Sequence, residues 1–253
     1  MITHDVAISS NTGSDNACTH VIKLRQRPDG SYFKDIVFTK TVNGASLKEQ
    51  HDYLRELIHI KFPNTIKVVI DAASAGAGLV SEMYNTWTYK DEVKNEVIEF
   101  PPLILDDDDN GFRFHGAIPM IRGINATLQF NSEFYPYMKA CFENQSLRFL
   151  TPSNETDDRY KLGEISAEKQ AVHFEHDILV QELSNIKQDL SEAGNIRYTR
   201  IVSRKKRDRA TSLMYGLSYI YELERASKES SSQSDIDDFM AMAGYLFGGT
   251  NTY

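Results

Sequence analysis

The chain has 253 residues, of which 41% are hydrophobic and 11% aromatic, which supplies a core for one large domain or two small ones. A formal net charge of −8 excludes a protein that coats nucleic acid indiscriminately, because such binding depends on lysine and arginine against phosphate. No stretch approaches the roughly 18 uncharged apolar residues of a membrane span, the first residues do not form a signal peptide, and two cysteines are too few for a disulfide framework, so we expect an intracellular protein.

Three strands are predicted at the start of the chain, because alternating and β-branched residues occupy 3–8, 18–24 and 32–42. A turn at Arg27-Pro-Asp-Gly30 separates the second strand from the third, so the simplest arrangement is a meander. Only two residues precede the first predicted strand. We therefore expect residue 1 to mark a domain boundary or an internal cut in a longer polypeptide.

A crossover unit follows the meander. Ser46-Leu-Lys-Glu49 has capping-box spacing and predicts a helix that ends near Pro63. The β-branched run from Ile66 to Ile70 predicts a fourth strand, and Asp71 stands where that strand ends. Since a strand, helix, strand order requires a crossover, the Asp71 strand should lie parallel to its partner through a right-handed connection.

The second half of the chain alternates between helical and extended patterns. Apolar periodicity predicts helices at 79–84, 132–143, 164–191, 211–224 and 235–247, and β-branched runs predict strands at 96–100, 147–150 and 197–203. Residues 118–123 are too broken to assign, and a polar loop is expected around Asp157 and Asp158. The predicted class is α/β, with a central mixed sheet and helices on both faces.

A serine-rich stretch at 228–234 predicts a linker near the end of the chain. It divides the sequence into a main domain, 1–226, and an appended linker with its helix, 227–253. The helix after the linker begins with acidic residues, which suits the positive end of a helix dipole.

Two clusters of possible metal ligands have simpler explanations. Asp106-Asp-Asp-Asp109 lacks the glycine and the alternation of a calcium loop, so a solvated acidic loop is favoured. His173 and His176 flank Glu175 on one predicted helix without a third ligand at a telling distance, so a solvated helix surface is favoured over zinc. The chain also lacks the phosphate-binding loop of P-loop ATPases and the Gly-x-Ser-x-Gly nucleophile elbow.

Three separated aspartates stand at the ends of predicted elements: Asp5 in the first strand, Asp71 at the end of the fourth, and Asp208 at the start of a late helix. The carboxyl edge of an open α/β sheet is where ligands and metals bind, so Asp71 is a candidate for chemistry. The alternative is that Asp71 only caps the following helix. A first and a fourth strand joined by one crossover are often neighbours, which would bring Asp5 and Asp71 together.

Clustered carboxylates repel one another unless cations lie among them. Two Mg²⁺ or Mn²⁺ ions roughly 4 Å apart would neutralise the three aspartates, activate a water and stabilise the leaving oxygen of a phosphodiester. A basic run surrounds Asp208 and would hold a phosphate backbone beside the metals. The run consists of Arg200, Arg204, Lys205, Lys206, Arg207 and Arg209. Its alternative interpretation is a solvated turn.

The sequence resembles the nuclease domain of the large terminase subunit of tailed bacteriophages and herpesviruses. The segments that carry the resemblance are Asp5-Val-Ala with the polar loop to Asp15, Val68-Val-Ile-Asp71 with its glycine-rich continuation, Tyr137 to Pro152, and Lys206 to Gly216. The resemblance implies an RNase H-like fold and two-metal cleavage of concatemeric double-stranded viral DNA during genome packaging, in the cytoplasm of an infected host cell. It also implies an ATPase motor domain, a small terminase subunit and a portal as partners.

The resemblance assigns roles to individual positions. Asp5 and Asp71 would be catalytic metal ligands from the sheet, and Asp208 the third ligand from the helix. DNA would be bound by Arg204, Lys205, Lys206, Arg207 and Arg209. The family motif often has paired acids, so Asp237 and Asp238 are an alternative third site, and Asp15 is a candidate outer acid.

Two other functions remain open at the level of sequence. A strand-end aspartate with glycine-rich turns also occurs in actin-like and sugar-kinase-like phosphotransferases, which would bind ATP tightly and leave DNA intact. A non-catalytic docking module of a packaging machine would instead keep the fold and use the basic run to hold DNA, with strong salt dependence.

Overall fold

The computed structural model describes residues 1–8, 16–108, 113–190 and 196–247, with the backbone alone from residue 230 onward. Asp15 and Asp109 lie outside the described residues. A central mixed sheet has the strand order β7-β8-β4-β1-β2-β3-β9. These strands are β1 (Ile2–Asp5), β2 (Ala17–Gln26), β3 (Tyr32–Val42), β4 (Val68–Asp71), β7 (Leu103–Leu105), β8 (Ile118–Ile124) and β9 (Leu147–Arg148).

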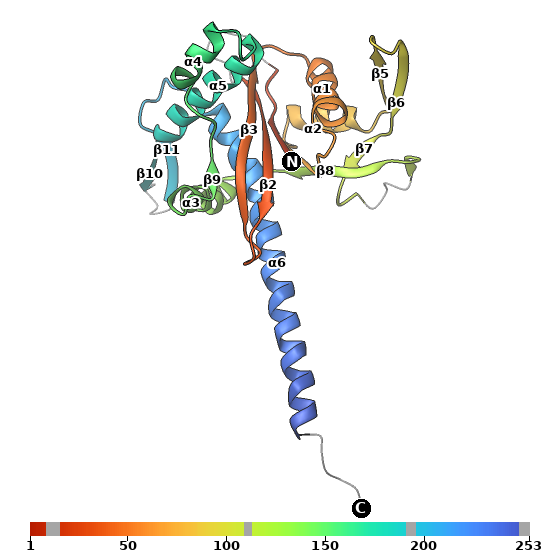
Figure 1. The fold of residues 1–253 in the computed structure, drawn as a ribbon, viewed down its shortest axis with the longest axis vertical. Helices are drawn as coiled ribbons and strands as arrows, with labels where there is room; N and C mark the ends of the chain where they lie inside the picture. Colours follow the sequence, from red (N-terminus) through yellow and green to blue (C-terminus); the bar gives the residue numbers. More distant parts are fainter. Residues whose placement is uncertain (9–15, 109–112, 191–195, 248–253) are drawn as a thin grey trace, which may run out of the picture.

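Helices and two small hairpins surround the central sheet (Figure 1). The helices are α1 (Leu47–Glu56) with its π-helical continuation η1 (Leu57–Lys61), α2 (Ala75–Met83), α3 (Leu128–Glu143), α4 (Ser153–Lys161), α5 (Ala167–Ser184) and α6 (Asp208–Phe247). The hairpins pair β5 (Trp87–Asp91) with β6 (Glu96–Phe100), and β10 (Ile186–Leu190) with β11 (Ile196–Arg200). None of the helices in the described ranges is long and apolar enough to cross a membrane.

The order of the central strands confirms the predicted meander and crossover. β1, β2 and β3 are antiparallel neighbours, whereas β4 lies parallel to β1. The capping box that opens α1 is also present, because Ser46 and Glu49 exchange side-chain and backbone hydrogen bonds. The predicted α/β class with a mixed sheet covered on both faces is therefore confirmed.

The sheet separates two hydrophobic cores. Alternate residues of β4 face opposite cores: Val68 and Ile70 pack with side chains of α1 and α2, whereas Val69 packs with side chains of α3, α5 and α6. Figure 1 shows α1 and α2 on one side of the sheet and α3, α5 and α6 on the other. Burial on both faces explains why β4 is an unbroken run of β-branched residues.

Several predicted elements were wrong in the second half of the chain. The helix predicted to reach residue 191 ends at Ser184, and a hairpin follows at once. Asn185 causes the change, because its side chain accepts from the amide of Val202 and donates to the carbonyl of the same residue. The unassigned segment 118–123 forms most of β8, and the expected polar loop around Asp157 forms α4.

The serine-rich segment 228–234 is not a linker in the structure but part of α6. Serine has a middling helix propensity, and neither proline nor glycine interrupts this segment, so the helix continues through it. Figure 1 shows the C-terminal part of α6 running out from the body of the protein.

Two histidines are buried in the central sheet as neutral rings. The Nε2 atom of His20 donates to the Arg209 carbonyl oxygen at 2.8 Å, and that of His4 donates to Oε1 of Gln50 at 2.9 Å. The Nδ1 atom of each ring accepts from a threonine hydroxyl at 2.8 Å. Both nitrogens of each ring therefore have a hydrogen-bond partner inside the protein.

We expect the stability of the protein to fall in mild acid. Burial lowers the pKa of His4 to about 4 and that of His20 to about 3. Below the ordinary histidine pKa of about 6.5, these histidines are protonated in the unfolded chain but stay neutral in the native protein. Each of them therefore lowers the free energy of unfolding by up to about 1.4 kcal/mol for each unit by which the pH falls. Urea unfolding from about pH 7 down to about pH 4 measures this slope. A flat profile in the wild type would contradict the expectation.

Candidate active site

Asp5 and Asp71 lie at the same edge of the sheet. β1 and β4 run parallel, with Ile2 opposite Val68 and His4 opposite Ile70, so the next residue along each strand is an aspartate. Both aspartates line a pocket of about 420 Å³, and Asp208 at the start of α6 lines it too. The other residues around the pocket are Val6, Ala126, Asn131, Tyr135, Arg200, Arg207, Thr211 and Tyr215. The structure therefore brings together the three acids that the sequence singled out.

The Asp71 carboxylate is held from two sides. Its Oδ1 atom accepts from the backbone amide of Ala73 at 3.0 Å, and its Oδ2 atom accepts from the Tyr215 hydroxyl at 3.3 Å. The N-cap position of α2 is Ser74, and no side chain caps that helix. The interpretation of Asp71 as a helix cap is therefore wrong, and its carboxylate faces the pocket instead.

Asp208 is fixed at the entrance of α6. Its side chain is only 5% exposed, and its Oδ2 atom accepts from the backbone amide of Asn16 at 2.8 Å. A negative charge in the first turn also suits the positive end of the helix dipole. The hydrogen bond from Asn16 and the helix dipole therefore both stabilise this carboxylate at the rim of the sheet.

A glycine permits the turn that carries Asp71. A Cβ atom at Gly76 would lie 1.5 Å from the Asp71 carbonyl oxygen, so only glycine fits where α2 begins. We expect Gly76→Ala to cost about 3 kcal/mol of unfolding free energy, since a backbone clash cannot relax as a side chain does. Gly78→Ala is the matched control in the same helix, because its methyl group would meet only the flexible end of Leu47, at 2.8 Å. Urea unfolding measures both, and equal costs would contradict the argument.

The basic run before α6 divides into three environments. Arg200 and Arg207 line the same pocket as the three aspartates. Arg204 and Lys205 are exposed, and half-buried Lys206 donates to the Asn16 side chain at 3.2 Å. These residues remain candidates for contact with a phosphate backbone.

Arg209 requires a correction to the predicted DNA-binding set. Its side chain is buried, and its guanidinium pairs with Glu175 and Glu182 at 2.7 Å each. Burial raises the pKa of Glu182, and the adjacent guanidinium opposes that rise. Glu182 also accepts from the backbone amides of Arg209 and Ala210, which ties the first turn of α6 to α5. Arg209 is therefore an internal clamp, because the helix turns its side chain away from solvent.

The remaining candidates of the sequence analysis lie elsewhere. Asp237 and Asp238 belong to the part of α6 described by its backbone alone, and a rise of about 1.5 Å per residue puts them roughly 40 Å along the helix from Asp208. This distance excludes them as a third acid at the same site of one chain. Asp15, the candidate outer acid, lies outside the described residues.

Residues of the acidic run and of the histidine pair, for which the sequence disfavoured a metal site, form ion pairs and hydrogen bonds within the protein. Asp106 pairs with Lys67 at 3.0 Å and with Arg122 at 3.6 Å. His176 is 1% exposed and accepts from the Leu150 amide, so this histidine is buried and not on the expected solvated surface. Asp106 and His176 therefore have structural partners within the protein.

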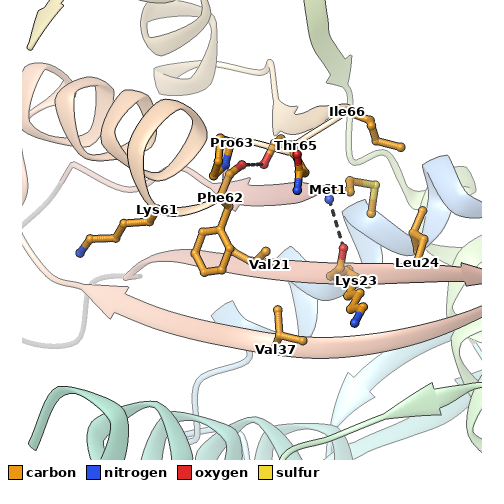
Figure 2. Close-up of a pocket in the computed structure, with 12 residues that line it drawn as sticks. Met1, Val21, Lys23, Leu24, Val37, Lys61, Phe62, Pro63, Thr65 and Ile66 are labelled. Atoms are coloured by element: carbon orange, nitrogen blue, oxygen red, sulfur yellow. Dashed lines mark hydrogen bonds between the residues drawn. The ribbon is translucent and has the colours of Figure 1, made fainter. Parts of the chain in front are cut away.

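Figure 2 shows a second pocket, of about 510 Å³, which lies at the opposite edge of the sheet, before the starts of β1 and β4. Its lining is mainly apolar, with Met1, Leu24 and Phe62 among the side chains and lysines 23 and 61 beside them. None of the three aspartates reaches it.

The donor set of the acid-lined pocket suits a hard divalent cation. Carboxylate oxygens are the ligands that Mg²⁺ takes, and these three come from separate elements of a rigid sheet and helix. In the parts of the chain that the structure describes, no three histidine, cysteine, aspartate or glutamate side chains already form a metal-binding group. The three carboxylates share a pocket, and ion binding would require them to draw closer.

Comparison with known proteins finds solved structures that resemble this one. No protein-family model and no curated protein sequence matches the chain. The large terminase nuclease from thermophilic phage G20c with bound magnesium has a TM-score of 0.50 and 13% identity, over 86% of this chain and 79% of that one. The cobalt-bound structure of that nuclease gives a TM-score of 0.48 at 13% identity over the same shares of both chains. The large terminase nuclease domain of Thermus phage P74-26 gives 0.46 at 12% identity, over 85% of this chain and 77% of its own.

A TM-score of 0.50 over 86% of this chain means that the magnesium-bound structure shares the fold described here. The chain therefore has the RNase H-like fold of a large terminase nuclease.

Proposed function

We propose that this protein is a metal-dependent endonuclease that cleaves double-stranded DNA by two-metal phosphodiester hydrolysis. The observation that carries the proposal is the convergence of Asp5, Asp71 and Asp208 on one pocket from β1, β4 and α6. Three carboxylates that line one pocket at the rim of an α/β sheet supply the oxygen ligands that divalent ions take, and bound ions would offset the repulsion between carboxylates drawn together around them.

Asp5, Asp71 and Asp208 would hold the metal ions. Magnesium and cobalt are bound in the structures of the similar phage G20c nuclease, which supports a divalent ion, Mg²⁺ or Mn²⁺, as the cofactor. When bound, such ions activate a water and stabilise the leaving oxygen of the phosphodiester. The protein contributes three carboxylates that line one pocket, and the pocket volume of about 420 Å³ admits a phosphate group.

The basic residues around the pocket would orient the substrate. Arg207 and Arg200 stand beside the acids, where a guanidinium can hold two phosphate oxygens at once. The exposed pair Arg204 and Lys205 would extend the contact along the DNA backbone, with half-buried Lys206 at its edge. Such contacts position DNA without selecting a sequence.

The biological setting is inferred from the likeness in fold. Its likeness to terminase nucleases supports cleavage of concatemeric viral DNA during genome packaging, in the cytoplasm of an infected host. An ATPase motor domain, a small terminase subunit and a portal would then be the partners of this domain.

A plasmid assay tests the activity. With Mn²⁺ or Mg²⁺, the purified protein should convert supercoiled plasmid to nicked and then linear DNA, and chelation of the metal should stop the conversion. Tight ATP binding without cleavage would instead support a phosphotransferase. Salt-sensitive DNA binding that survives replacement of all three aspartates, again without cleavage, would support a non-catalytic docking module.

A further inference from the structure

The hydroxyl of Tyr215 joins α6 to the carboxylate at the end of β4. We infer that Tyr215 is a positioning residue, which fixes Asp71 relative to Asp208 so that the two carboxylates bind a divalent cation together. The inference rests on the proposed function, because it assigns a role within the same site. It adds a residue that the sequence analysis did not identify as functional.

One face of α6 supplies both the third acid and this hydroxyl. Asp208, Thr211 and Tyr215 are three and four residues apart, so they lie on one side of the helix, and all three line the pocket. Any shift of the first turns of α6 therefore moves Asp208 and the Tyr215 hydroxyl together. The hydrogen bond from Tyr215 to Asp71 couples that movement to β4.

The other hydrogen bond to Asp71 is local. Ala73, which donates to Oδ1, lies two residues from Asp71 on the same loop, so it orients the carboxylate only with respect to its own turn. Tyr215 lies 144 positions away in the sequence and donates to Oδ2. It therefore sets the orientation of Asp71 with respect to the helix that carries the other acid.

The reach of Tyr215 depends on close packing of α6 against the sheet. A Cβ atom at Gly216 would lie 2.9 Å from Cδ1 of Ile22 and 3.1 Å from Cγ2 of Thr3, so glycine allows the helix to lie close to β1 and β2. The Tyr215 ring is 3% exposed and packs edge-on against Phe130, with ring centroids 6.1 Å apart. The phenol is thus held in place by its surroundings.

The Tyr215 hydroxyl donates to Oδ2 of Asp71, and both side chains line the acid-lined pocket. This is the arrangement that orients metal-binding carboxylates from outside the metal's own ligand set.

Calorimetric titration of the full chain with Mn²⁺ tests the inference. Tyr215→Phe removes only the hydroxyl and should weaken Mn²⁺ binding by about 10-fold or more, the usual effect of losing a residue that orients a ligand. Tyr137→Phe is the matched control, because its hydroxyl also donates to a carboxylate, that of Glu224 at 2.7 Å, but neither residue lines the pocket. It should leave the Mn²⁺ affinity unchanged.

A double-mutant cycle separates positioning from a general structural role. In the Asp71→Asn background, the further change Tyr215→Phe should alter the remaining Mn²⁺ affinity by less than about 2-fold, since the hydroxyl acts through Asp71. Urea unfolding in the presence of a chelator checks that each variant is folded. If the wild type binds Mn²⁺ and Tyr215→Phe binds it equally well, the positioning role is wrong and the nuclease proposal stands. If the wild type binds no Mn²⁺ and cuts no DNA, both are wrong.

Discussion

Asp71→Asn should reduce metal-dependent plasmid cleavage by about 1000-fold or more. The amide keeps the shape of the side chain and one oxygen, so the change removes charge with little effect on packing. Metal ions contribute several kcal/mol to phosphodiester cleavage, and each 1.4 kcal/mol corresponds to about a factor of ten in rate. Initial rates of nicking with Mn²⁺, for variant and wild type, measure the effect.

Asp107→Asn is the matched control for this prediction. Asp107 is an exposed acid on the loop after β7 and does not line the acid-lined pocket. Its replacement makes the same change in net charge, so cleavage should stay within about 2-fold of wild type, as expected for a surface site away from special features. Equal cleavage by Asp71→Asn and wild type would rule out the proposed metal site.

Arg209→Met should destabilise the whole protein by about 3 to 5 kcal/mol, because removing one partner of a buried ion pair leaves its carboxylates uncompensated. Methionine fills much of the same volume, but Glu175 and Glu182 would lose the charge that both contact at 2.7 Å. The backbone amides bound by Glu182 lie in the first turn of α6, so cleavage should fall as well. Urea unfolding at neutral pH gives the stability change.

Comparison with Arg204→Met distinguishes an arginine that stabilises the fold, as Arg209 does, from an arginine that contacts DNA. Arg204 is exposed, so its replacement should change stability by less than about 0.5 kcal/mol. It should instead weaken DNA binding and lower the slope of log K against log salt concentration by about one. If Arg209→Met gave this pattern and kept full stability, the original assignment of Arg209 to DNA binding would be right.

The first half of the fold was predictable because its signals are local. The run Val68, Val69 and Ile70 is β-branched at every position, and only a strand buried on both faces requires this. The polar residue at its end marks the sheet edge, and the crossover through α1 from β3 brings β4 back parallel to β1. These facts, all present in the sequence, placed Asp5 and Asp71 side by side.

The second half was less predictable because distant contacts decide it. Apolar periodicity continues past Ser184, and the helix stops there because Asn185 bonds the backbone of Val202, a residue 17 positions later. The serine-rich segment is helical although its composition is typical of linkers. Local propensity is a weak prior, and such contacts override it.

The sequence by itself determined the acids, the strand ends that present them and the basic character of the segment before α6. Only the tertiary structure decided which basic residues are available, because Arg207 and Arg209 are near neighbours in the chain and yet one lines the pocket and the other is buried between two glutamates. It also decided the role of Tyr215, whose hydroxyl meets a carboxylate 144 positions away. Side-chain direction at the start of a helix depends on what packs around it, and that information lies in contacts between distant segments.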